Sequence, residues 1–300
     1  MLPLPAEETV AVFGRVQLDY FYVATARAAT SILLHGQPDR GTARRRGADR
    51  RGARLRLRRL EREEPADMGE WATWPRYFEE MPLTDSAVHE AAARCGTALV
   101  VIGRSAGESR ENALEPGSYY LTQEEKTLLS QVTAAFSRVA VVIDAGSVMD
   151  LSWLDEYPIG AALLVWQGGM ESGNAAADVL TGKVNPCGKL TDTVAKRYED
   201  YPSAGDFPGE DFNCYTEDIY VGYRYFETFA PEKVLYPFGF GLSYTKFEVR
   251  LLSADETPMA LPPLLPSKIP AAAPARKLCS STAPRRRGGW GNRPKCCAPL

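Results

Sequence analysis

The chain has 300 residues, a formal net charge of −3 and 45% hydrophobic residues, a composition typical of a globular protein of one or two domains. No apolar run approaches the ~20 residues of a membrane-spanning helix, and the first residues lack the pattern of a signal peptide. We therefore expect a cytoplasmic protein that contacts no membrane. Because the six cysteines form no C-x-x-C pair and only two histidines are present, we predict no metal site.

The first part of the chain changes character abruptly. Residues 1–23 include AVFGRV, which predicts a first strand ending at Gly14. Residues 24–65 are rich in arginine, a composition that can bind nucleic acid, but they contain no aromatic residues for stacking and no recognisable motif. We favour the interpretation that this segment is aberrant and disordered, as a GC-rich gene read out of frame would produce, and expect no binding to nucleic acid.

The middle of the chain alternates strand patterns with helix patterns. Aliphatic runs without polar alternation predict parallel strands covered on both faces, at 99–102, 139–143 and 162–166. Helices are predicted after Thr84 or Asp85 and after Thr122, since these residues are good N-caps. The alternation predicts an α/β fold with a mostly parallel sheet. Residues 251–300 are rich in Pro, Ala and Arg and predict a disordered tail.

A polar loop follows the first of these aliphatic runs and fits two chemistries. Residues 103–107 match G-x-S-x-G, the elbow that exposes a nucleophilic serine in α/β-hydrolases. That elbow opens directly into a helix, whereas Pro116 and Gly117 favour an extended loop. The histidine of such enzymes also follows the serine, but His35 and His89 both precede Ser105. We therefore do not expect a serine hydrolase.

The second chemistry is acid–base catalysis by a carboxyl group on the same loop. Glu108 follows a glycine beyond the carboxyl end of a predicted parallel strand, where ligands of α/β proteins bind. Alternatively, Glu108 and Glu111 are solvated charges paired with Arg104 and Arg110. The residues alone leave both interpretations open.

Longer blocks of the sequence carry a resemblance to a known family. They are VVIGRSAGESRENALEPGSYYLT, RVAVVIDAGSVMDLSW, LLVWQGGMESGNAAADVLTGKVNPCGKLTDT, EDIYVGYRYFETF and YPFGFGLSYTKFEV. Together with AVFGRV they resemble glycoside hydrolase family 3, the β-glucosidase family. The resemblance implies a three-layer α/β/α sandwich over 66–250, with its first strand region at 1–23. The irregular insert at 24–65 and the disordered tail at 251–300 depart from the family pattern.

The same resemblance implies retaining hydrolysis of a β-glycoside or oligosaccharide, without a cofactor. It makes Glu108 the acid–base residue and Arg110 and Glu111 contacts of the sugar. The aspartate nucleophile belongs to a separate (β/α)8 barrel, which nothing in this chain resembles and which we expect beyond Leu300. Retaining glycosidases need two carboxyl groups about 5–5.5 Å apart, so we predict negligible hydrolysis by this chain alone. The alternative is a non-catalytic sugar-binding or remnant domain.

Overall fold

The computed structural model describes residues 1–5, 8–17, 20–23, 26–28, 75–107, 112–169, 171–206, 215–246, 248–249 and 267–268. The chain divides into two compact units, Met1–Lys183 and Val184–Leu300. The domain boundaries expected near residues 24, 66 and 251 lie outside the described residues and stay predictions. No helix among these residues is long and apolar enough to cross a bilayer.

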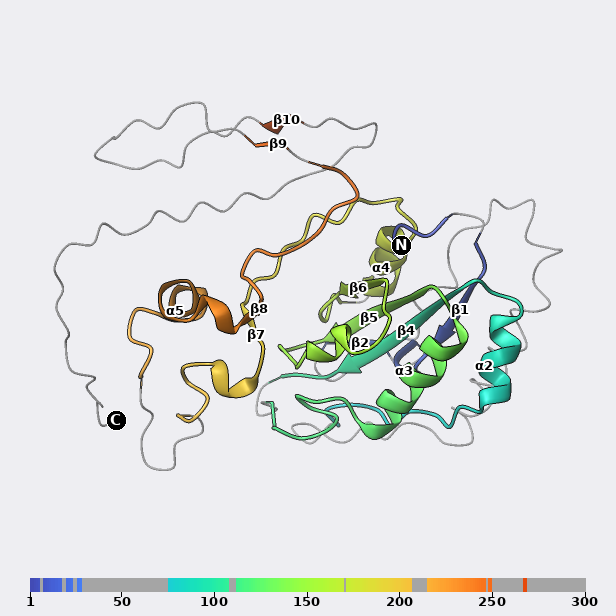
Figure 1. Ribbon diagram of the computed structural model, residues 1–300, viewed down its shortest axis with the longest axis horizontal. Coiled ribbons are helices and arrows are strands. Elements are labelled where there is room, and N and C mark those ends of the chain that lie inside the picture. The colour runs from blue at the N-terminus through green and yellow to red at the C-terminus, as the bar shows by residue number, and fades with distance from the viewer. Residues whose placement is uncertain are drawn as a thin grey trace. The chain divides into compact units, whose positions relative to one another are not determined.

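The first unit contains a four-stranded parallel sheet in the order β1-β4-β5-β6 (Figure 1). Its strands are β1 (Val10–Phe13), β4 (Thr97–Arg104), β5 (Val139–Ala145) and β6 (Ala161–Leu164). Every residue of the central strands β4 and β5 is buried. Strands covered on both faces need apolar side chains in both directions, which is why their sequences show no polar alternation. The predicted α/β class and parallel strands are confirmed.

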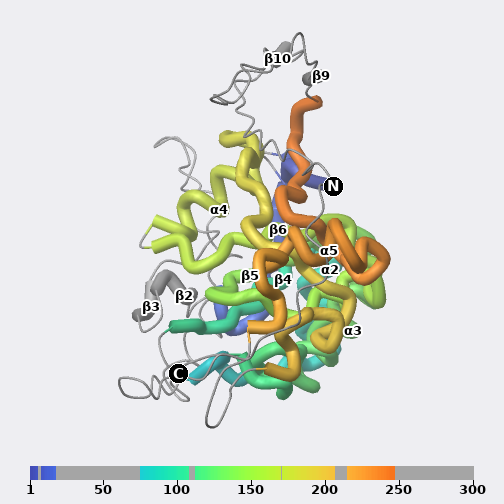
Figure 2. Tube along the Cα trace, turned by 90° about the vertical axis from the view of Figure 1, so that its left-hand side faces the viewer, coloured from blue at the N-terminus to red at the C-terminus, as the bar shows by residue number. Residues whose placement is uncertain are grey.

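Helices cover both faces of this sheet. They are α2 (Asp85–Ala92), α3 (Gln123–Ala135) and α4 (Ser172–Leu180). Figure 2 shows α4 and α3 on opposite sides of β4 and β5. Ala176 and Leu180 of α4 join a core cluster with alternate residues of the two central strands, namely Leu99, Val101, Ala140 and Val142. The intervening side chains, such as Val100 and Ile102, point to the other face, where α3 buries Leu129 and Val132.

Shorter elements complete the first unit: η1 (Arg15–Gln17), β2 (Tyr20–Val23), β3 (Ala26–Ala28) and η2 (Ser152–Asp155). The turn from β1 into η1 requires Gly14, which has a φ of 94°. A Cβ atom at this position would lie 2.1 Å from the carbonyl oxygen of Val101 on β4. Glycine therefore lets the chain turn against β4 and brings Arg15 beside the carboxyl half of that strand.

The second unit contains β7 (Val194–Ala195), η3 (Tyr198–Asp200), α5 (Tyr223–Phe229), η4 (Pro231–Lys233), β8 (Val234–Tyr236), β9 (Glu248–Val249) and β10 (Ser267–Lys268). Strands β7 and β8 pair antiparallel, as do β9 and β10. A small core gathers around Phe226 of α5, with Ala195 and Ala230. Tyr201 packs edge-on against Phe226, with ring centroids 5.8 Å apart. This unit is thus held mainly by aromatic packing.

Candidate active site

Strand β4 leads into the loop that the sequence singles out. The strand ends at Arg104, and the next helix, α3, begins after Thr122. Residues 105–107 and 112–121 are not helical, so β4 does not open directly into a helix as a serine elbow would. Glu108, Arg110 and Glu111 lie outside the described residues. Their roles in catalysis and sugar binding stay predictions.

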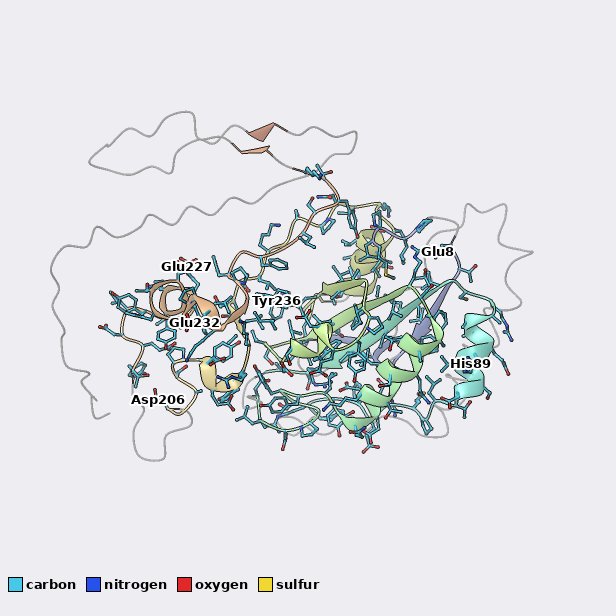
Figure 3. The ribbon with its side chains drawn as sticks, viewed as in Figure 1. Glu8, His89, Asp206, Glu227, Glu232 and Tyr236 are labelled. Atoms are coloured by element: carbon cyan, nitrogen blue, oxygen red, sulfur yellow. The ribbon has the colours of Figure 1, made fainter. Side chains whose placement is uncertain are left out.

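Ser105 is engaged with the backbone of the segment before α2. Its hydroxyl group donates to the carbonyl oxygen of Pro75 at 2.5 Å, and its N–H donates to that of Arg76 at 2.7 Å. His89 lies on α2, which precedes β4 in the chain (Figure 3). Ser105 instead follows the carboxyl end of that strand. Ser105 therefore anchors the loop, and within the described part of the chain its hydroxyl donates to a backbone carbonyl oxygen and not to a histidine.

The guanidinium group of Arg104 is buried, with 2% of the side chain exposed, and its five N–H groups make five hydrogen bonds. Two of them donate to the two carboxylate oxygens of Glu125 in α3, both at 2.6 Å. The others donate to the carbonyl oxygens of Gly103 at 2.8 Å, Ser118 at 3.1 Å and Tyr120 at 3.2 Å. Among the described residues, the carboxylate that pairs with Arg104 is thus Glu125. The alternative in which Glu108 and Glu111 are solvated charges lies outside the described residues and stays open.

Glu125 links this arginine to the start of α3. Its Oε2 atom accepts the N–H of Thr122 at 2.8 Å, while the Thr122 hydroxyl accepts the N–H of Glu125 at 3.1 Å. This is a capping box, and it confirms Thr122 as the N-cap. The pattern T-x-x-E at 122–125 signals the box in the sequence. Nothing local reveals that the same carboxylate also binds Arg104, 21 residues earlier.

A second set of contacts fixes the part of the loop that follows Glu108 in the sequence. The side-chain amide of Asn112 donates to the carbonyl oxygen of Val148 at 2.6 Å, and its carbonyl oxygen accepts the hydroxyl of Ser147 at 2.8 Å. The N–H of Ala113 donates to the hydroxyl oxygen of Ser118 at 2.9 Å. These bonds tie the loop to the segment that follows β5. The four residues 108–111 thus connect two anchored positions.

The segment before α2 supports the base of the loop through Tyr77 and Arg76. Gly117 has a φ of 83°, and a Cβ atom there would lie 2.2 Å from the Tyr77 ring. The same ring lies 5.8 Å from the Arg104 guanidinium carbon, a cation–π distance. Arg76 also forms an ion pair with Glu115 at 3.0 Å. Tyr77 thus packs against both Gly117 and Arg104 at the base of the loop.

Loops from three strands meet at Ala106, in the chain segment that follows β4. A Cβ atom on Gly146, after β5, would lie 2.7 Å from the Cβ atom of Ala106 and 2.7 Å from the side-chain amide of Gln167, after β6. The carboxyl ends of parallel strands lie along one edge of a sheet, which is where α/β proteins bind ligands. Ala106 precedes Glu108 by two residues. The position of the loop is therefore suited to a ligand-binding role.

Burial raises the pKa of one carboxyl group in the segment before α2. Desolvation raises the pKa of Glu80 from 4.5 to about 8, and the charge of Glu125 adds to the shift, while a hydrogen bond from the Arg15 N–H opposes it. Burial also raises the pKa of the Tyr77 phenol, with smaller contributions from nearby glutamates. Over the part of the chain that the structure describes, no three His, Cys, Asp or Glu side chains are grouped so that they could hold a metal ion.

Comparison with known proteins decides the family. The sequence profile of the glycosyl hydrolase family 3 C-terminal domain matches residues 1–244. The chain belongs to glycosyl hydrolase family 3. A β-glucosidase of Ruminococcus albus is 43% identical over 258 residues, which cover 83% of this chain and 26% of that enzyme. β-Glucosidase A of Butyrivibrio fibrisolvens is 42% identical over 215 residues, which cover 63% of this chain and 26% of the relative.

Solved structures of family 3 enzymes share the fold. A β-glucosidase from Paenibacillus barengoltzii aligns with a TM-score of 0.73 at 43% identity, covering 84% of this chain and 29% of that one. β-Glucosidase 3B of Thermotoga neapolitana, in complex with glucose, aligns with a TM-score of 0.70 at 32% identity, covering 85% of this chain and 37% of that one. This family 3 domain therefore spans between 26% and 37% of the length of these relatives.

Proposed function

We propose that this family 3 domain supplies the acid–base half of a retaining β-glycosidase site. In this proposal Glu108 protonates the leaving-group oxygen in the first step and activates water in the second, and Arg110 and Glu111 contact the sugar. The observation that carries it is the family match over residues 1–244, in which the Ser-Ala-Gly-Glu loop follows the carboxyl end of β4. The names of the relatives make a β-glucoside the substrate class to test first.

The nucleophilic half of the site is proposed to come from a (β/α)8 barrel outside this chain. Two carboxyl groups must face each other across the scissile bond, and an acid that stays protonated near neutral pH needs a desolvating wall. The domain alone is accordingly expected to be inactive. The expected cytoplasmic location and the absence of nucleic-acid binding remain predictions of the sequence, the second of which salt-sensitive DNA binding would contradict.

Reconstitution tests the proposal. The full chain would be mixed with the part of the Ruminococcus albus β-glucosidase that has no counterpart here, and hydrolysis of aryl β-glucosides would be measured. We expect turnover from the mixture and negligible turnover from either component. Glu108→Gln should abolish hydrolysis of phenyl β-glucoside, whose leaving group needs a proton, and spare the first step with 2,4-dinitrophenyl β-glucoside, whose leaving group does not.

Glu124→Gln is the matched control, because Glu124 is an exposed carboxylate in the first turn of α3. It should leave both substrates unaffected. Equal losses for the two substrates in Glu108→Gln would contradict the acid–base role. Turnover by the isolated chain that depends on Glu108 would contradict the half-site, and hydrolysis of an aryl ester that is lost in Ser105→Ala would favour the serine-hydrolase alternative.

A second candidate function is a non-catalytic sugar-binding or remnant domain. In that case the domain would bind a sugar without hydrolysing it. Glucose binding to the isolated chain, measured by saturation-transfer NMR and unaffected by added barrel, would support this candidate.

A further inference from the structure

The acid–base loop is closed at its base by one buried ion pair. Arg104 is the last residue of β4, and Glu125 lies in the first turn of α3, so the two residues stand at either end of the loop. Their side chains are 2% and 3% exposed. Both carboxylate oxygens of Glu125 accept an N–H of Arg104 at 2.6 Å, the fork geometry that gives a planar, directional contact.

Arg104 also donates hydrogen bonds to backbone carbonyl groups in the part of the loop that leads into α3. Its remaining donors reach the carbonyl oxygens of Ser118 and Tyr120. The backbone N–H groups of this region make local turns, since Gly117 N–H donates to Tyr120 and Tyr119 N–H donates to Ala113. One guanidinium group therefore joins the strand, the returning loop and the helix start. Lysine could not replace it, because an ammonium group has three donors and no fork.

A general acid must sit within hydrogen-bond reach of the oxygen it protonates, and small errors of placement are costly for the rate. Glu108 is four residues after Arg104 and four before Asn112, which is bonded to Ser147 and Val148. Ser105 adds a further anchor on the near side. The described residues on both sides of the segment 108–111 are therefore held by hydrogen bonds. In general, fixed ends restrict the conformations of a short connecting segment.

We propose that Arg104 and Glu125 form a positioning pair for the acid–base carboxyl group of Glu108. The pair does not touch the substrate. It sets the geometry of the loop through the five hydrogen bonds of Arg104 and the capping box of Glu125. This inference rests on the proposed function for the role of Glu108, but the effect on the loop can be measured without activity.

Hydrogen–deuterium exchange of the full chain tests the effect on the loop. Arg104→Lys keeps the charge and loses the fork, and Glu125→Gln keeps the shape and loses the charge. In both variants we expect amides of 112–120 to exchange on the order of tenfold to a hundredfold faster, the factor for one lost charge-assisted hydrogen bond. Over the same minutes of labelling, β4 and β5 should stay protected. Lys183→Gln is the control, because it breaks an exposed ion pair with Asp178 in the same unit.

The reconstituted enzyme tests the consequence for catalysis. Both variants should lower kcat/KM, which reports the first step, more for phenyl β-glucoside than for 2,4-dinitrophenyl β-glucoside. A misplaced acid slows that step only where the leaving group needs a proton, whereas the second step is the same for both substrates. Unchanged loop exchange, or loop and sheet exchanging faster by equal factors, would overturn the inference and leave a purely stabilising pair. If Glu108→Gln shows the leaving-group effect and the pair variants do not, the positioning role fails while the proposed function stands.

Discussion

Glu80 accepts the backbone N–H of Arg15 through both carboxylate oxygens, at 3.0 and 2.9 Å. The two residues are 65 positions apart, and the contact joins the segment before α2 to the turn after β1. The Arg15 side chain reinforces it by donating to the carbonyl oxygen of Glu79 at 3.2 Å. A carboxyl group with a raised pKa thus supports the turn after β1, beside the carboxyl half of β4.

The raised pKa of Glu80 predicts that stability falls as the pH rises. Between pH 4.5 and about 8 the folded chain keeps a proton on Glu80 that the unfolded chain has lost. The free energy of unfolding should therefore decrease across this window, with a slope of at most about 1.4 kcal/mol per pH unit. Urea denaturation at several pH values measures the slope. Glu80→Gln should remove this contribution, and Glu79→Gln, an exposed neighbour, should not; identical slopes in all three proteins would refute the prediction.

Alanine substitutions at two glycines with positive φ should distinguish the cost of backbone strain from the cost of steric overlap. Gly14→Ala adds a Cβ atom 2.1 Å from the carbonyl oxygen of Val101, so strain and overpacking act together. We expect a loss of roughly 3 kcal/mol or more in the free energy of unfolding. Gly169→Ala meets nothing within 4 Å and should cost only the strain, about 1–2 kcal/mol. Equal losses in chemical denaturation would show that contact with β4 is unimportant.

The two threonine N-caps differ in burial and should therefore differ in their contribution to the free energy of unfolding. Thr122 is buried in a reciprocal capping box, so Thr122→Ala should lower the free energy of unfolding by about 1–2 kcal/mol. Thr84 is exposed and its hydroxyl accepts the Ala87 N–H at 3.4 Å, so Thr84→Ala should cost about 0.5 kcal/mol. The serine variants, which keep the hydroxyl, are the controls. A larger loss at Thr84 than at Thr122 would contradict this ranking.

The Arg104–Glu125 pair should show strong coupling in a double-mutant cycle. Arg104→Met leaves a buried carboxylate without its cation and should cost about 3–5 kcal/mol. Replacing both residues, by Met and Leu, should cost less than the sum of the single changes, because no charge is then stranded. The exposed pair Lys183–Asp178 should give a coupling of at most about 1 kcal/mol. Similar couplings for the two pairs would show that burial of Arg104 does not matter.

The sequence by itself determined the α/β class, the parallel strands and the cap of α3. These features depend on local chemistry: a strand covered on both faces must be aliphatic at every position, as 99–102 is, and Thr122 caps a helix whose box partner is three residues away. The blocks shared with family 3 pointed to Glu108, whose placement lies outside the described residues. Periodicity and propensity alone could not decide whether the Glu108 carboxyl group acts in acid–base catalysis or is a solvated loop charge.

Only the tertiary structure decided what holds the loop. Arg104 has charged neighbours in sequence on the loop, yet its partner is Glu125, because the crossover from β4 to α3 brings the helix start back over the end of the strand. Glu80 and Arg15 meet across 65 residues for the same kind of reason. Such contacts form between residues that are distant in the sequence and that only the tertiary fold brings together. A buried guanidinium group must pair with a carboxylate that the fold places near it, so no local sequence pattern could reveal these contacts.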